Sequence, residues 1–111
     1  MKETGSGLHY MIIKEGNGPK AKKGDIAIID YTVRLITGDV VYSSKTEGPK
    51  IFKIGHGNVE SGLEEGILLL KKGDKAKIIL PSHLAYGLHG DEKKIPPKMP
   101  LVYDVELKNL K

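Results

Sequence analysis

The chain has 111 residues, enough for one domain with its own core, and 39% of them are hydrophobic and 29% charged. This composition excludes a disordered chain and a membrane span, and the absence of cysteine excludes disulfides, zinc–thiolate sites and thiol catalysis. The net charge of +4 is spread along the chain, whereas nucleic-acid binding calls for clustered basic residues.

The first ten residues, MKETGSGLHY, lack the apolar core of a signal peptide. We expect a cytoplasmic protein if the chain is complete, and a periplasmic or lipoprotein-anchored one if it is an excised domain, so the compartment stays open. The small polar residues at the start predict a flexible segment over residues 1–7. A single domain is then expected over residues 8–111.

A long strand is predicted over residues 26–35, where apolar and polar residues alternate with period two. The turn signal at 37–39 predicts that residues 40–42 pair with it as a hairpin. Shorter strands are expected at 8–13 and 51–54, with loops at 15–19 and 45–50. The alternation places five side chains of the long strand on the inner face: Ala27, Ile29, Tyr31, Val33 and Leu35.

Residues 59–74, VESGLEEGILLLKKGD, predict one helix of about ten residues. Ser61 followed three residues later by Glu64 is typical of a capping box, and the lysines and glycine at 71–73 suit a C-terminal end. A helix this short does not persist alone, so its apolar stripe is expected to pack on the sheet. The stripe consists of Leu63, Ile67 and Leu70.

After the helix, a strand is predicted over residues 76–80 and ends at Pro81, and an irregular segment follows at 84–100. The last strand, 101–107, alternates again. Together these elements predict an α+β domain with four or five antiparallel strands and one helix. The inner face of the last strand is expected to carry Leu101, Tyr103, Val105 and Leu107.

The tetrapeptide Lys-Lys-Gly-Asp occurs twice, at residues 22–25 and 71–74, and precedes a predicted strand each time. The upstream flanks differ completely. The repeat therefore indicates the same turn chemistry used twice, and not an internal duplication.

Conventional catalytic motifs are absent from the sequence. The Gly-His-Gly at 55–57 has no third glycine and no surrounding βαβ unit, so a cofactor loop is not predicted. Neither the serines at 43–44 nor Ser82 has a nucleophile-elbow context. The best metal-ligand spacing among the histidines, at His83, His89 and Asp91, is too weak to predict a metal site. An enzyme with this sequence needs a chemistry without nucleophile, metal or cofactor.

Seven motifs follow one another along the chain: SGLHY at 6–10, GD and YT at 24–32, VYSS at 41–44, GLEEGI at 62–67, LPSHLAYG at 80–87, IPP at 95–97 and LVYDVEL at 101–107. In order and spacing they are similar to the FKBP-type peptidyl-prolyl cis-trans isomerases. The resemblance implies a twisted antiparallel sheet of about five strands wrapped around one short helix, with a substrate pocket between them. A narrower resemblance, in PSHLAYGLHGDEKKI, is to the FKBP-like proteins associated with gliding motility in Bacteroidetes.

The resemblance also implies a set of site residues. The backbone N–H of Glu60 and the hydroxyl of Tyr86 are expected to hold substrate carbonyls. For the inward tyrosines, the alternative is an ordinary core aromatic whose hydroxyl reaches a partner. The expected catalytic residues are Tyr31, Leu63, Tyr86 and Tyr103, and the expected substrate-binding residues are Val41, Tyr42, Phe52, Val59, Glu60 and Ile95.

Several positions depart from the family pattern. Val41 and Tyr42 stand where Phe-Asp is usual, Leu63 where a pocket-floor Trp is usual, Lys50 where an aromatic is common and Glu60 where a β-branched residue is common. A buried aromatic covers 150–250 Å², so the exchange of the usual Trp and Phe for the aliphatic Leu63 and Val41 predicts binding weaker by ~1–3 kcal/mol. The pocket is expected to have a shallower floor and a more charged rim.

Three functions are consistent with the sequence. The first is a monomeric, cofactor-free isomerase that accelerates X-Pro rotation in polypeptides and assists protein folding. The second is a catalytically weak or inactive binding module or chaperone that holds Pro-containing segments. The third, a nucleic-acid binder, is disfavoured by the even spread of charge.

Overall fold

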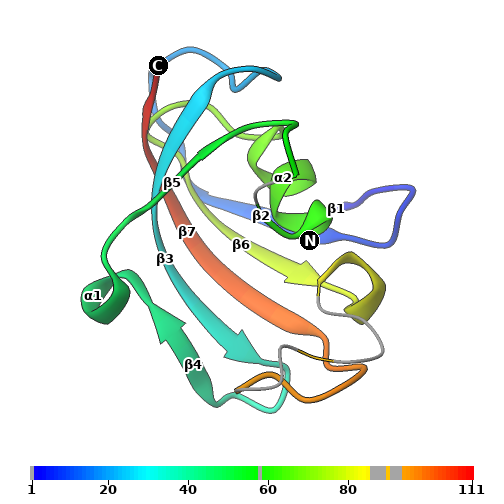
Figure 1. Cartoon of the computed structure of the whole chain (residues 1–111). Coiled ribbons are helices and arrows are strands. Elements are labelled where there is room, and N and C mark those ends of the chain that lie inside the picture. Colours follow the sequence, from blue (N-terminus) through cyan, green and yellow to red (C-terminus); the bar gives the residue numbers. More distant parts are fainter. Residues whose placement is uncertain (1, 58, 86–89, 91–93) are drawn as a thin grey trace.

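One antiparallel sheet that curves around a single short helix dominates the computed structural model, which describes residues 2–57, 59–85, 90 and 94–111 (Figure 1). The strand order is β1-β2-β6-β7-β3-β4, and β5 also pairs with β3. This confirms the predicted α+β class. The elements are β1 (Lys2–Glu3), β2 (His9–Lys14), β3 (Ile26–Leu35), β4 (Val40–Ser43), α1 (Ser44–Glu47), β5 (Lys50–Lys53), α2 (Ser61–Ile67), β6 (Lys75–Leu80), the 3-10 helix η1 (Ser82–Leu84) and β7 (Leu101–Leu110).

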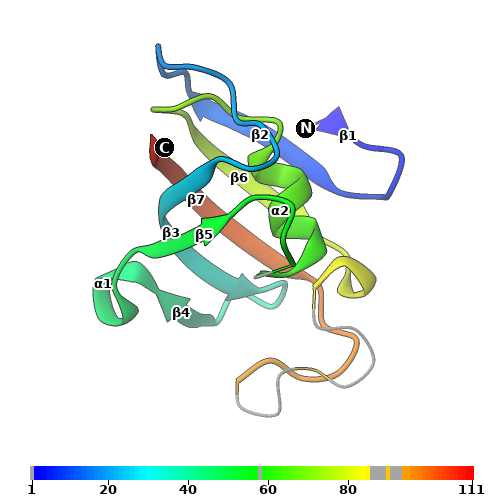
Figure 2. The same cartoon turned by 45° about the horizontal axis from the view of Figure 1, so that its top comes forward.

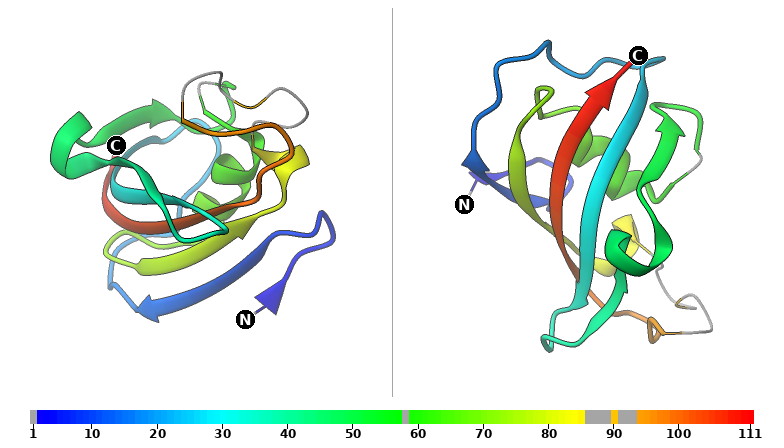
Figure 3. Two further views of the ribbon diagram at one scale, coloured as in Figure 1. Left: turned by 90° about the horizontal axis from the view of Figure 1, so that it is seen from below. Right: turned by 90° about the vertical axis from the view of Figure 1, so that its left-hand side faces the viewer.

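The long strands β3 and β7 run antiparallel side by side at the centre of the sheet (Figure 3, right). Their register pairs Tyr31 with Val105 and Val33 with Tyr103. Every residue predicted to face inward on these two strands is buried, which confirms the alternation read from the sequence. The sheet therefore has an apolar concave face toward α2 and a polar convex face.

Helix α2 lies in the concavity of the sheet, as Figure 2 and the left view of Figure 3 show. The burial of its predicted stripe is confirmed: Leu63 and Ile67 are fully buried on α2, and Leu70 is fully buried just after the helix. The predicted C-terminal end at residues 71–73 is wrong, because α2 already ends at Ile67 and residues 71–74 form a separate turn. Close packing on β6 depends on Gly62, where an added Cβ would lie 2.6 Å from Leu80 Cδ2 and 2.8 Å from the Leu84 carbonyl oxygen. Glycine at this position lets the helix approach the sheet closely.

The helix begins differently from the sequence prediction. Glu60 is the N-cap residue, Ser61 is already helical, and no side chain caps the helix. The predicted capping box is therefore wrong. The Glu64 carboxylate instead accepts a hydrogen bond from the backbone N–H of Gly55, because the incoming loop offers that donor.

Three short elements were not predicted: α1, β1 and the 3-10 helix η1 that follows Pro81. The helix α1 occupies the first half of the predicted loop at 45–50, and Ser43 caps it by accepting a hydrogen bond from the Lys45 N–H. The strand β1 pairs with β2 within the segment expected to be flexible, through Lys2 opposite Tyr10 and Glu3 opposite His9. The division into residues 1–7 and a domain over 8–111 stays a prediction. In the part of the chain that is described, no helix is long and apolar enough to cross a membrane.

The two Lys-Lys-Gly-Asp segments form the same turn. In each, the aspartate N–H donates to the first lysine's carbonyl, and the aspartate carboxylate accepts from that lysine's N–H. The glycine has φ of 93° at Gly24 and 94° at Gly73, a region that favours glycine. This agrees with the interpretation of the repeat as reused turn chemistry.

Candidate functional site

A cavity of about 190 Å³ opens on the concave side of the sheet. Three of its walls come from one row across the strands, since Val33 on β3 pairs with Tyr42 on β4 and with Tyr103 on β7. Period-two alternation explains why these side chains share a face. The lining residues are Tyr31, Val33, Tyr42, Glu47, Lys50 and Tyr103.

A buried tyrosine and a carboxylate meet beside this cavity. The Tyr103 hydroxyl donates a hydrogen bond to Glu60 Oε2 at 2.7 Å, and Tyr103 is only 1% exposed. Glu60 is the residue that precedes α2, so the hydrogen bond joins the start of the helix to the beginning of β7. The cavity wall is thereby fixed from both the sheet and the helix.

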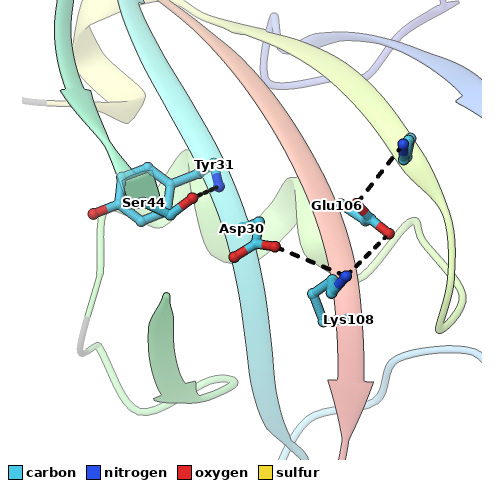
Figure 4. A network of polar contacts seen from close by, with 6 residues as sticks. Asp30, Tyr31, Ser44, Glu106 and Lys108 are labelled. Atoms are coloured by element: carbon cyan, nitrogen blue, oxygen red, sulfur yellow. Dashed lines mark hydrogen bonds and ion pairs between the residues drawn. The ribbon is translucent and has the colours of Figure 1, made fainter. Parts of the chain in front are cut away.

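The backbone of Tyr31 is fixed by a hydrogen bond, and its side chain lines the cavity. Its N–H donates to the Ser44 hydroxyl at 3.1 Å, which connects β3 with the start of α1 (Figure 4). Burial raises the pKa of the Tyr31 phenol, and the carboxylates of Glu47 and Glu60 raise this pKa further. The phenol therefore stays a neutral hydrogen-bond donor at neutral pH.

Two lysines lie over aromatic rings at the site. The Lys50 ammonium is 5.2 Å from the centre of the Tyr31 ring, and the Lys94 ammonium is 5.1 Å from the centre of the Tyr42 ring. Both distances lie within the range of a cation–π interaction. The charged rim predicted from Lys50 is thus present, with the cations placed on ring faces.

The remaining predicted site residues are not among those that line the cavity. Phe52, Leu63 and Ile95 are buried in the core, and Val41 and Val59 are partly buried against it. Tyr86 lies outside the described residues, as do His89 and Asp91 of the weak histidine spacing. Whether Leu63 forms the floor and Tyr86 holds a carbonyl therefore stays a prediction.

Two lining residues were predicted neither among the site residues nor, like Lys50, at the charged rim of the pocket. Val33 faces inward by the same alternation that placed Tyr31, so its signal was present in the sequence. Glu47 carried no such signal, because it comes from α1, which lies within a segment that was predicted to be a loop.

A larger cavity, of about 520 Å³, is lined mostly by convex-face residues of the sheet together with α1, and the buried residues Tyr31, Ala76 and Val105 also contribute to its lining. Its acids are already engaged with lysines: the Glu106 carboxylate lies 3.6 Å from the Lys108 ammonium (Figure 4). It also lies 3.9 Å from the Lys75 ammonium. Exposed ion pairs of this kind are typical of a solvated surface. We place the candidate site at the smaller cavity, because its wall includes Tyr103, which is buried and does not line the larger cavity.

Within the described ranges, no group of three or more His, Cys, Asp or Glu side chains could hold a metal ion. The residues at the concave cavity offer hydroxyls, aromatic faces and charged groups, and Tyr103 is hydrogen-bonded to Glu60 there. Such a site can surround and desolvate a small apolar group and position its polar neighbours.

Comparison with known proteins identifies the relatives of this chain. A model of the FKBP-type peptidyl-prolyl cis-trans isomerase family matches residues 18–108. The probable isomerase FkpA of Neisseria meningitidis is 44% identical over 108 residues, which are 96% of this chain and 39% of that protein. FK506-binding protein 2 of Yarrowia lipolytica is 41% identical over 102 residues, which are 91% of this chain and 71% of that protein.

The crystal structure of FkpA from Escherichia coli superposes with a TM-score of 0.91 at 38% identity and covers 99% of this chain and 51% of that one. This likeness confirms the predicted fold. The chain spans about two fifths of the length of the FkpA proteins that it matches.

Proposed function

Because this chain belongs to the family of FKBP-type peptidyl-prolyl cis-trans isomerases, we propose that its concave cavity accelerates X-Pro rotation in polypeptide substrates. The observation that carries the proposal is the pair of buried tyrosines, Tyr31 and Tyr103, on a cavity bounded by sheet and helix. Proline has an apolar ring of the size such a cavity admits. Isomerisation of this kind would assist protein folding, because proline rotation is slow enough to limit it.

The reaction needs no bond to be broken, which fits the lack of a nucleophile or cofactor loop in the sequence. Rotating a peptide bond costs about 18–20 kcal/mol because amide resonance is lost. The twisted amide is less polar at its carbonyl than the planar one, so a water-excluding aromatic cavity disfavours the ground state relative to it. A thousandfold acceleration requires only about 4 kcal/mol, which desolvation and one or two hydrogen bonds can supply.

The neutral phenol of Tyr31 suits this reaction, because it can donate a hydrogen bond without adding charge to the cavity. We assign the hydroxyl of Tyr86 and the backbone N–H of Glu60 to the substrate carbonyls, following the resemblance in the LPSHLAYG and GLEEGI motifs. Val41, Phe52, Val59, Leu63 and Ile95 would complete the apolar surroundings.

The experiment is to measure cis-to-trans relaxation of short proline peptides with and without the protein, for the wild type, Tyr31→Ala and Tyr10→Ala. Tyr10 is a matched control, since it is a partly buried tyrosine on β2 that does not line the cavity. We expect acceleration by the wild type and Tyr10→Ala, and a loss of at least tenfold in Tyr31→Ala, about 1.4 kcal/mol of transition-state stabilisation. Full activity in Tyr31→Ala would contradict the placement of the site.

A non-catalytic binding module is the second candidate, and the charged groups Glu47, Lys50 and Lys94 at the cavity favour it. Such groups keep water near the amide and oppose the desolvation that rotation needs. The same assay separates the two functions. Binding of unfolded proline-containing clients with no acceleration at high protein concentration would establish the binding module instead.

Two relatives carry the words FK506-binding in their names. For this chain we expect weak binding of FK506-like macrolides, because Leu63 replaces the usual floor Trp and Tyr42 replaces the usual acid. Leu63→Trp tests this expectation: a gain in affinity or rate would support Leu63 as the floor, and an unchanged rate and affinity would count against it.

The resemblance to the gliding-motility group rests on residues 81–95 alone, and none of the relatives reported above is described by that role. Membership of that group stays a prediction. The monomeric state and the choice of compartment are likewise expectations, and light scattering of the purified chain measures the first of them.

A further inference from the structure

Glu60 has a side-chain placement that its local sequence position does not explain. It is the N-cap residue of α2, a position where the side chain usually bonds to the backbone of the first turn, and Glu is not among the preferred residues there. No side-chain cap bond forms. The carboxylate is instead held by the Tyr103 hydroxyl at 2.7 Å, beside the concave cavity. A broken local rule at a cavity points to a functional constraint.

The Glu60 side chain is a carboxylate, which accepts several hydrogen bonds, and the Tyr103 phenol that contacts it is an uncharged donor. The negative charges of the Glu47 and Glu60 carboxylates act at the cavity, because both raise the pKa of the Tyr31 phenol. Two negative charges therefore lie within electrostatic reach of one hydroxyl on the cavity wall.

Unlike the carboxylates, the two lysines of the site lie over aromatic rings. Lys50 lies over the face of the Tyr31 ring and Lys94 over the face of the Tyr42 ring. Ring faces attract these ammonium groups by themselves. The start of α2 thus contributes negative charge from one side of the cavity, while the lysines stand on aromatic walls contributed by the sheet.

We propose that Glu60 is a specificity-determining residue of this cavity, and that its carboxylate selects polypeptides with lysine or arginine immediately before proline. The proposal rests on the function proposed above for the same cavity. With the apolar proline ring between the tyrosines, the side chain of the preceding residue is the nearest substrate group that varies. The long stem of lysine or arginine can lie along the tyrosines while its charged end reaches the carboxylate.

The test compares kcat/KM for short peptides that differ only in the residue before proline, namely Lys, Met, Gln and Glu. Met has a length similar to Lys without its charge. We expect the wild type to favour Lys over Met by about fivefold, the equivalent of one partly exposed ion pair of about 1 kcal/mol. The Glu peptide is expected to be the poorest substrate, and high salt should shrink these differences.

The decisive variant is Glu60→Gln, which removes the charge while its amide oxygen can still accept from Tyr103. We expect the ratio of Lys to Met to fall to about one in this variant. Asp104→Asn is the matched control, because it removes the same charge from the convex face, and it should keep the wild-type ratio. Urea unfolding of both variants verifies that the fold is retained.

An active wild type with no preference for Lys would overturn the proposal, as would an unchanged preference in Glu60→Gln. Loss of the preference in Glu47→Gln alone would assign it to the other carboxylate and also overturn the proposal. Failure of the proposed isomerase function has a different signature: no peptide is accelerated. In that case, NMR titration with the Lys and Met peptides still decides the role of Glu60, because tighter Lys binding that Glu60→Gln abolishes would uphold it.

Discussion

The two faces of the β3–β7 pair share one backbone but differ in burial and charge. On the concave face, Tyr31 and Tyr103 are buried at the cavity. On the convex face, their sequence neighbours Asp30 and Asp104 are partly exposed and form ion pairs with lysine and arginine. A proline site requires the exclusion of water, and only the face covered by α2 provides it. The larger cavity is therefore not the more suitable one.

The largest expected effect comes from two adjacent isoleucines on opposite faces of β3. Ile29 is fully buried and Ile28 is only partly so. Ile29→Ala should lower the free energy of unfolding by about 2–5 kcal/mol, through lost burial and the cavity left behind. Ile28→Ala should cost clearly less. Urea unfolding of both variants measures the difference, and equal losses would contradict the assignment of the two faces.

The second prediction concerns the contact between α2 and the concave face. Gly62→Ala forces a methyl group against Leu80 and the backbone oxygen of Leu84, so it should cost about 1–3 kcal/mol by overpacking. Gly5→Ala is the control, because no atom lies within 4 Å of an added Cβ there. Thermal unfolding compares the two. A neutral Gly62→Ala would mean that α2 is not held this closely to the sheet.

The third prediction uses the pH dependence of Tyr31. Because burial and two carboxylates raise its pKa in the folded state above the ordinary value of 10.0, the unfolded chain loses the phenol proton first. The stability that the protonated phenol gives the folded state is fully present below pH 10.0, and it is lost as the pH rises through the pKa of the folded state. Measured by urea unfolding at increasing pH, the stability of Tyr31→Phe should decline less steeply than that of the wild type. Parallel curves would show that the phenol is not protected.

The smallest effect is expected on the convex face. Asp30 and Glu106 lie directly opposite each other on β3 and β7, and the Lys108 ammonium lies 3.9 Å from one and 3.6 Å from the other (Figure 4). Lys108→Met leaves two like charges facing each other, yet at an exposed site this should cost at most about 1 kcal/mol. The loss should shrink at high salt. A loss as large as that of Ile29→Ala would erase the distinction between the two faces.

Sequence periodicity was enough to predict the inner faces of β3 and β7 and the buried stripe of α2. When one face of an element is buried, apolar residues recur along the sequence with the period of that element. The start of α2 was predicted wrongly for a tertiary reason. Ser61 and Glu64 have the spacing of a capping box, but the loop at Gly55 engages Glu64 and Tyr103 engages Glu60. The contribution of Glu47 to the cavity was missed because a helix of four residues leaves almost no periodic signal.

The two Lys-Lys-Gly-Asp turns show what local sequence determines and what only tertiary structure determines. The tetrapeptide by itself determined the turn, since glycine at positive φ and an aspartate that bonds back to the first lysine are local properties. Tertiary structure alone decided that Asp25 stays at the surface while Asp74 is fully buried and also accepts from the Gly16 N–H at 2.7 Å. The cavity follows the same division. Alternation determined that the tyrosines face inward, whereas the curvature of the sheet around α2 decided which carboxylate and which lysines meet them, because those contacts join residues far apart in the chain.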